Sequence, residues 1–287
     1  MSRLIGIGTL NYWHIMIDIL SEIIAHKRKE VAGQKGRLSL SDLEKKLSTT
    51  ADIPFYSMKG ALENSQSGII AEFKRRSPSK GWLFQTANPD QSGQVVNEVT
   101  KAYASAGASV LSVLTDEKYF GGTLDDLRQA TAGVRIPVMR KEFIVDEYQL
   151  FEAKLAGASA VLLIAAAITP EECRRFTEQA NQLGLEVLLE LHDEGEVDYI
   201  GPHNSLVGIN NRNLGSFVTD LQKSFRMAEL LPKETVWISE SGISDPGIVK
   251  ELRQAGYRGF LIGEHFMKSD NPGQSLKDFI DSIVVRL

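Results

Sequence analysis

Charged and amide side chains interrupt several apolar runs of this sequence near the points where the runs end. They are Glu72, Lys74, Lys141, Glu190, Asn210, Arg212 and Glu240. Lysines and glutamates can donate and accept protons in an active site, and an arginine binds an anionic oxygen group through two parallel hydrogen bonds. The residue types therefore predict acid–base chemistry on an anionic substrate.

The spacing inside these runs indicates that the charged side chains converge. Side chains two residues apart on a strand share a face, so Glu72 points with Lys74. The same spacing places Asn210 with Arg212. A single pair is equally well explained as a structural salt bridge inside a barrel, whereas five strands that contribute polar residues together favour one shared pocket.

Short apolar runs alternate with helical patterns along most of the chain. The runs cover residues 69–74, 109–115, 137–143, 160–164, 186–190, 206–210, 236–240 and 259–263. Helical patterns separate them near residues 90–105, 124–133, 147–156, 170–183, 220–230, 245–255 and 275–286, with a weak one at 194–200. Runs rich in Val, Ile and Leu suit strands buried on both faces of a parallel sheet.

Eight such βα units predict a closed (β/α)8 TIM barrel, in which catalytic groups lie at the C-terminal ends of the strands. The alternative is an open doubly wound sheet. The sequence has neither a strand-GxGxxG-helix opening nor a Walker loop, which such nucleotide-binding sheets use. The barrel is therefore the preferred fold.

Additional helices are predicted before the first strand. Residues 17–31 have apolar side chains at helical spacing, and Ser41 with Glu44 has the spacing of a capping box ahead of a short second helix. We expect a helical extension over about residues 17–66 and a barrel over about residues 67–287, together forming one domain. Whether these helices cover the barrel or join the mouth of its pocket stays open.

The composition excludes several classes of protein. The net charge of -5 gives no global basic field for nucleic acid or a membrane surface, and no apolar run approaches a membrane span. Cys173 is the only cysteine, and the five histidines show no metal-binding spacing, so we expect no disulfide within the chain and no metal. The first residues lack a signal-peptide pattern, which favours a cytoplasmic protein.

Two glycine-containing segments predict a phosphate site. Residues 240–243 precede a helix, and residues 261–263 end the eighth run. Glycines allow backbone N–H groups to approach phosphate oxygens, although an ordinary turn capped by Ser244 or Asp245 explains part of the pattern. His192 is interpreted as a loop or capping residue rather than a proton carrier, and Lys223, Lys250 and Lys268 are interpreted as solvated surface charges.

Several motifs resemble those of indole-3-glycerol-phosphate synthases, in the order of that family. They are IIAEFKRRSPSKGW (69–82), MRKEFIVDEYQ (139–149), LLELHDE (188–194), GINNRNL (208–214) and SESGI (239–243). The resemblance runs from about residue 16 to the C-terminus. It implies conversion of 1-(2-carboxyphenylamino)-1-deoxyribulose 5-phosphate to indole-3-glycerol phosphate with release of CO₂ and water, without a cofactor. We expect the chain to act as a monomer.

The same resemblance implies catalytic roles. Lys141 matches the general acid of ring closure, and Glu190 matches the base of the later steps. Lys74 matches the lysine that contacts the substrate carboxylate and assists dehydration. Glu72 would hold the lysines charged, since a nearby carboxylate favours the ammonium form, and Glu240 would share that role.

Binding roles are also implied by the resemblance. Asn210 and Arg212 would position the substrate. Positions that match the lining around the anthranilate ring are Ser77, Phe120, Phe143 and Leu214. Those that match the phosphate site are Ser241, Gly242, Gly263 and Glu264. Glu264 departs from the small residue expected there, so we expect its backbone N–H to donate to the phosphate and its side chain to point away. Residues 1–15 precede the usual start of the family and are expected to be either a non-essential extension or the product of an upstream start codon.

Other functions remain open from the residues alone. A Schiff-base aldolase would use Lys141, and a sugar-phosphate isomerase is another phosphate-binding barrel. Phosphoribosylanthranilate isomerase would need a Cys and Asp pair that the sequence does not place. A barrel that binds a phosphorylated ligand without turnover predicts the loss of a catalytic group, yet Lys74, Lys141 and Glu190 are all present.

Overall fold

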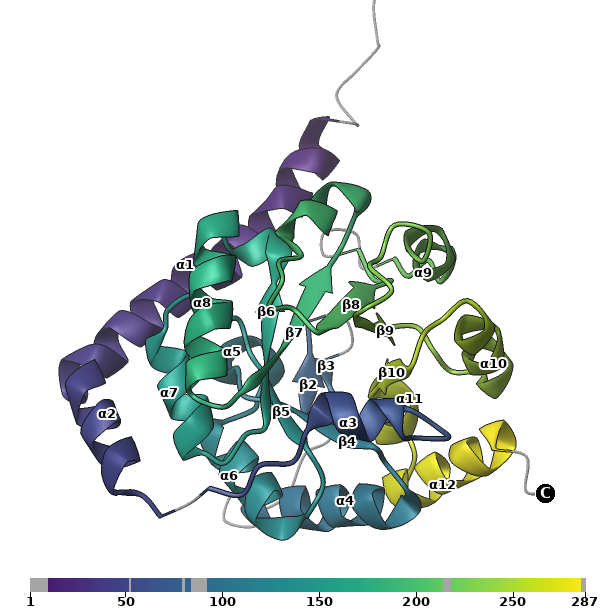
Figure 1. Cartoon of the computed structure of the whole chain (residues 1–287), viewed down its shortest axis with the longest axis horizontal. Helices are drawn as coiled ribbons and strands as arrows, with labels where there is room; N and C mark the ends of the chain where they lie inside the picture. Colours follow the sequence, from purple (N-terminus) through teal and green to yellow (C-terminus); the bar gives the residue numbers. More distant parts are fainter. Residues whose placement is uncertain (1–9, 52, 79–80, 84–91, 214–217, 285–287) are drawn as a thin grey trace, which may run out of the picture.

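The barrel predicted from the alternating runs is confirmed. The structure is a computed structural model that describes the chain apart from residues 1–9, 52, 79–80, 84–91, 214–217 and 285–287. Its eight parallel strands close in the order β1-β10-β9-β8-β7-β6-β5-β4 (Figure 1). They are β1 (Ile69–Phe73), β4 (Val110–Leu114), β5 (Val138–Lys141), β6 (Ala160–Ile164), β7 (Glu186–Leu191), β8 (Leu206–Asn210), β9 (Val236–Glu240) and β10 (Gly259–Ile262).

A ring of helices covers the outside of the barrel (Figure 1). Its members are α4 (Ser92–Ala106), α6 (Leu124–Gly133), α7 (Tyr148–Leu155), α8 (Pro170–Gln182), α9 (Gln222–Met227), α10 (Pro246–Gln254) and α12 (Pro272–Ile283). Between β7 and β8 the chain forms only a 3-10 helix, η3 (Glu194–Tyr199), where the helical pattern was weakest. Cys173 of α8 is buried in the core, as expected of a packing residue.

Short helices and strands follow several barrel strands at their carboxyl ends. After β1 the chain forms a small hairpin of β2 (Arg76–Ser77) and β3 (Gly81–Trp82). The other additions are α5 (Glu117–Phe120) after β4, η2 (Ala165–Ala167) after β6 and α11 (Glu264–Met267) after β10. They surround the end of the barrel where the predicted site residues lie.

Three helices precede the barrel: α1 (Leu10–Arg37), α2 (Leu40–Thr49) and α3 (Met58–Glu63). The first begins earlier than predicted, inside the segment expected to be an extension. The capping box predicted at Ser41 and Glu44 is wrong, because the cap of α2 is Ser39 and its partner is Asp42. The box needs its acceptor directly before the first helical turn, and the chain already enters that turn at Leu40.

The third helix closes the amino-terminal end of the barrel. Its residues Met58 and Leu62 are fully buried, and the helix contacts β4 and β9. Glu186, the first residue of β7, accepts hydrogen bonds from the Ser57 hydroxyl and from the backbone N–H groups of Met58 and Lys59. A carboxylate at the amino end of a helix satisfies its free N–H groups, which fixes α3 on the barrel.

A buried lysine fixes α1 to the opposite end. Lys27 is 1% exposed, and its ammonium lies 3.0 Å from Asp116 Oδ2 and 3.2 Å from Glu142 Oε1. Asp116 follows β4 and Glu142 follows β5, so the ion pairs attach α1 beside the carboxyl ends of these strands. Figure 1 shows α1 running along the outside of α7 and α8. Within the described part of the chain, no helix is sufficiently long and apolar to cross a membrane.

Candidate active site

A cavity of about 940 Å³ opens at the carboxyl ends of the barrel strands. It brings together the predicted residues Glu72, Lys74, Ser77, Phe120, Lys141, Phe143, Glu190, Asn210, Arg212, Ser241, Gly242, Gly263 and Glu264. Leu214 lies outside the described residues. Ile19, Leu20 and Ile23 also line the cavity, so α1 forms part of its mouth, which answers the question that the sequence left open.

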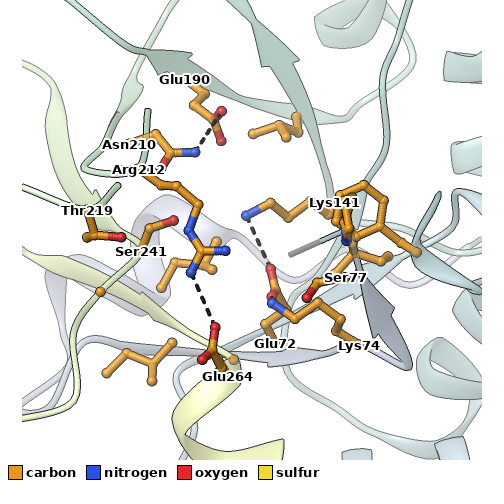
Figure 2. Close-up of a pocket in the computed structure, with 18 of the residues that line it drawn as sticks. Glu72, Lys74, Ser77, Lys141, Glu190, Asn210, Arg212, Thr219, Ser241 and Glu264 are labelled. Carbon is orange, nitrogen blue, oxygen red and sulfur yellow. Dashed lines mark hydrogen bonds and ion pairs between the residues drawn. The ribbon is translucent and has the colours of Figure 1, made fainter. Parts of the chain in front are cut away.

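Glu72 joins the two lysines of the site (Figure 2). Its Oε1 lies 2.8 Å from Lys74 Nζ, and its Oε2 lies 3.2 Å from Lys141 Nζ. Burial alone would raise the pKa of Glu72, but the two ammonium groups lower it to about 2. Conversely, burial would lower the pKa of Lys141, and the neighbouring carboxylates, Glu72 foremost, raise it above its usual value. The ammonium group of Lys141 is therefore held charged, and the side chains of both lysines line one cavity.

The close approach of Glu72 explains one glycine. A Cβ atom at Gly263 would lie 2.5 Å from Glu72 Oε1 and 2.9 Å from Glu72 Cβ. Contacts this short do not occur between non-bonded atoms, so the residue that follows β10 must be glycine for Glu72 to reach the lysines. Gly263 therefore has a packing requirement in addition to the phosphate contact expected of it.

Two polar side chains, His192 and Asn210, hold the carboxylate of Glu190. Its Oε1 lies 2.7 Å from His192 Nε2 and accepts a hydrogen bond of 3.1 Å from Asn210 Nδ2. Burial would raise the pKa of Glu190, but the interactions with His192 and the charge of Lys141 hold it below its usual value. His192 was assigned from the sequence to a loop or a cap, yet its side chain is 10% exposed and contacts the predicted base.

Glu240 lies one layer below the cavity. It is fully buried and does not line the pocket, and its Oε2 accepts a hydrogen bond of 3.2 Å from Lys141 Nζ. The structure thus places Lys141 between Glu72 and Glu240, with Glu190 the next carboxylate that influences it.

Arg212 and Glu264 form an ion pair in the lining of the cavity (Figure 2). Arg212 Nη2 donates to Glu264 Oε2 at 3.2 Å, and Lys268 Nζ donates to Glu264 Oε1 at 2.7 Å. The prediction that the Glu264 side chain points away is wrong, because these two cations attract it toward the pocket. Lys268 is exposed, as predicted for a solvated charge, but it also lines the cavity.

The loop after β9 carries the predicted phosphate residues. Ser241 has φ 70° and Gly242 has φ 77°, a left-handed turn that is strained for serine and natural for glycine. A Cβ atom at Gly242 would lie 2.2 Å from Thr219 Cγ2, so the loop and Thr219 are in close contact. Asp245 caps α10 by accepting the Gly247 N–H at 2.8 Å, so the turn explanation also holds for this segment.

The aromatic side of the cavity lies near α1. The rings of Phe120 and Phe143 have centroids 6.1 Å apart, and Ser77 is buried beside them in the lining. Lys74, Lys141 and Arg212 line the same cavity as these rings. The arrangement fits an elongated substrate with a flat apolar end and an anionic end.

Lys223 was also predicted to be a solvated surface charge, but it is partly buried. Its Nζ donates to the Asn210 carbonyl at 2.9 Å, and burial lowers its pKa.

Among the described residues no group of three or more His, Cys, Asp or Glu could hold a metal ion.

Comparison with known proteins decides the family. The indole-3-glycerol phosphate synthase family model matches residues 20–279. An indole-3-glycerol phosphate synthase of Bacteroides thetaiotaomicron is 56% identical over 269 residues, covering 93% of this chain and 100% of the relative. One from Neisseria meningitidis serogroup C is 41% identical over 259 residues, covering 89% and 96%.

The chain belongs to the indole-3-glycerol phosphate synthase family. It is thus a carboxy-lyase of tryptophan biosynthesis, and this membership selects the synthase among the functions left open by the residues. The synthase barrel also resembles a crystal structure of the tryptophan synthase alpha subunit from Legionella pneumophila, with a TM-score of 0.56 and 14% identity over 80% of this chain and 97% of that one. At this identity the likeness concerns the fold alone.

Proposed function

We propose that this cavity carries out the synthase reaction, with Lys141 as the general acid of ring closure. The observation that carries the proposal is the position of the Lys141 ammonium, held between Glu72 and Glu240 in the middle of the pocket. The rings of Phe120 and Phe143 and the guanidinium group of Arg212 line the same cavity. A proton donor in that place can reach the central carbonyl of the substrate.

The substrate would bind with its three chemical parts in three regions. The anthranilate ring packs against Phe120, Phe143 and the apolar residues of α1, and its carboxylate meets Lys74. The phosphate binds at the loop of Ser241 and Gly242 and at the start of α11. In many barrels this is the region, after the seventh and eighth strands, that binds phosphate.

The reaction then needs three steps. The ring carbon that bears the carboxylate attacks the ketone carbon while Lys141 gives its proton to the ketone oxygen. Loss of CO₂ from the same ring carbon restores the aromatic ring. In the last step Lys74 protonates the leaving hydroxyl group, which departs as water. Glu190 removes a proton from the carbon next to nitrogen in the new five-membered ring, which completes the indole.

Turnover by the purified protein tests this proposal. The carboxyphenylamino-deoxyribulose phosphate should yield indole-3-glycerol phosphate, followed by its fluorescence. Lys141→Ala should lose roughly 10²- to 10⁴-fold in kcat, the usual contribution of a general acid. Lys250→Ala is the matched control, because Lys250 is exposed on α10 away from the cavity lining. No turnover by the folded protein would refute the function, and full turnover by Lys141→Ala would move the acid to Lys74.

We also propose that the chain works as a monomer in the cytoplasm and that residues 16–287 form one catalytic domain. The residues that match the acid, base, ring-binding and phosphate-binding positions of the family meet in one pocket of a single chain, apart from Leu214 outside the described residues, so no assigned role calls for a second copy. A sedimentation measurement at assay concentrations tests the monomer, and a dimer that is required for activity would contradict it.

A further inference from the structure

Two glutamates meet above a glycine inside the barrel. Glu190 of β7 is paired in register with Gly208 of β8, and Glu240 follows on β9 beside Asn210. A Cβ atom at Gly208 would lie 2.2 Å from Glu240 Oε1. The Glu240 carboxyl group therefore occupies the space of the missing side chain of Gly208 on β8. Gly208 and Glu190 are paired on adjacent strands, which are only about 4.8 Å apart, so this carboxyl group lies directly beside Glu190.

One oxygen of each glutamate has a donor, and the other does not. Oε1 of Glu190 is bound by His192 and Asn210, and Oε2 of Glu240 is bound by Lys141. The remaining two oxygens, Glu190 Oε2 and Glu240 Oε1, are buried without a hydrogen-bond donor among the described residues. A buried carboxylate oxygen without a donor is costly, and two neighbouring carboxylates also repel each other.

One proton satisfies both oxygens. A protonated carboxyl group is a donor, whereas an ionised one can only accept. We propose that Glu190 and Glu240 share a single proton in the resting enzyme, with Glu240 as the donor to Glu190. The charged groups that face Glu240 are Lys141 from β5 and Glu190 from β7, with His192 behind Glu190.

The electrostatics of the two sites agree with this assignment. Burial and the charge of Glu190 raise the pKa of Glu240 to about 8, against the opposing effect of Lys141. The pKa of Glu190 is shifted in the other direction, because His192 and Lys141 stabilise its charge. Such opposite shifts are the expected result when two carboxyl groups occupy one site.

The shared proton has a consequence for Lys141 that rests on the proposed function. Two ionised neighbours, Glu72 and Glu240, would hold the proton of Lys141 tightly. With Glu240 neutral, only Glu72 acts as a full counter-charge in contact with the ammonium group. Lys141 is then a stronger acid and can transfer its proton more readily to the ketone oxygen.

Carbon-13 NMR of glutamate carboxyl groups tests the shared proton in the substrate-free enzyme. Protein labelled at this carbon is titrated from about pH 6 to about pH 10. We expect one glutamate signal that titrates near pH 8 and is absent from Glu240→Gln. In Glu190→Gln the same signal should titrate lower by about one unit or more, since the negative neighbour is gone.

Glu142 provides the control, because its pKa is also raised by burial although Lys27 and Arg140 oppose the shift. Glu142→Gln should remove its own signal and leave that of Glu240 in place. A signal near pH 8 that persists in Glu240→Gln, or no such signal at all, would overturn the proposal. If Glu240→Gln does not fold, an unshifted signal in Glu190→Gln overturns it alone. The titration needs no substrate, so absence of synthase turnover would leave its result intact.

Discussion

Replacing Lys27 by methionine should destabilise the protein by about 3–5 kcal/mol, the cost of breaking a buried ion pair and leaving its partners uncompensated. The side chain is 1% exposed and its ammonium contacts Asp116 at 3.0 Å and Glu142 at 3.2 Å. Methionine fills much of the same volume, so the loss measures the charge rather than a cavity. Urea unfolding followed by circular dichroism gives the change in unfolding free energy.

The stability lost in Lys27→Met should increase as the pH rises. Burial already raises the pKa of Glu142 above its usual 4.5, and Lys27 is the largest opposing influence. Without Lys27 that pKa rises further, so the folded variant binds more protons than the unfolded chain above pH 4.5. Its stability then falls as the pH rises toward the folded pKa, and the deficit relative to wild type should be larger near pH 8 than near pH 5.

Lys29→Met is the matched control, because Lys29 lies two residues away on the exposed face of α1. It should change the unfolding free energy by less than about 0.5 kcal/mol. A loss below about 1 kcal/mol in Lys27→Met, or a deficit that shrinks with rising pH, would refute the buried ion pair as the attachment of α1.

Three further perturbations follow from the site. His192→Ala should lower kcat by roughly 10- to 100-fold, because a hydrogen bond to the charged Glu190 contributes about 1.5–3 kcal/mol. His192→Asn should recover part of this loss in steady-state assays, and an unchanged kcat in the alanine variant would contradict a positioning role. Lys268→Ala should raise KM about fivefold with little change in kcat, since the half-exposed ammonium contributes only about 1 kcal/mol to phosphate binding. Equal KM values in titrations with substrate would remove Lys268 from the phosphate site. A chain that begins at Met16 should retain the wild-type kcat and KM, and a loss of either would show that residues 1–15 contribute to function.

The barrel and the convergence of its polar residues could be predicted because both depend on local pattern. Strand ends were marked by the change from apolar to charged residues, as at Glu72 and Lys141. The carboxyl ends of all strands in a parallel barrel lie on one face, so residues at these ends could be predicted to share a pocket without knowledge of any distance. The cap of α2 was missed by two residues, because Ser39 and Ser41 offer the same side chain and only the path of the chain separates them.

Other features could not be predicted because they depend on contacts between distant segments. Lys27 has the spacing of an ordinary helix residue, and only Asp116 and Glu142 show why it is buried. Arg212 follows β8, whereas Glu264 and Lys268 follow β10, two strands away in the barrel. Their pairing turns the Glu264 carboxylate toward the cavity. The contact of His192 with Glu190 had a signal, since residues two apart on one strand share a face.

The central claim is that Lys141 is the acid of ring closure, which must precede loss of CO₂. The most direct measurement is CO₂ release in a single turnover, with substrate labelled in the carboxyl group and enzyme in excess. Lys141→Ala should slow CO₂ release by the same roughly 10²- to 10⁴-fold as formation of the indole, while Lys74→Ala should slow indole formation more than CO₂ release. Release of CO₂ at the wild-type rate by Lys141→Ala would contradict the claim.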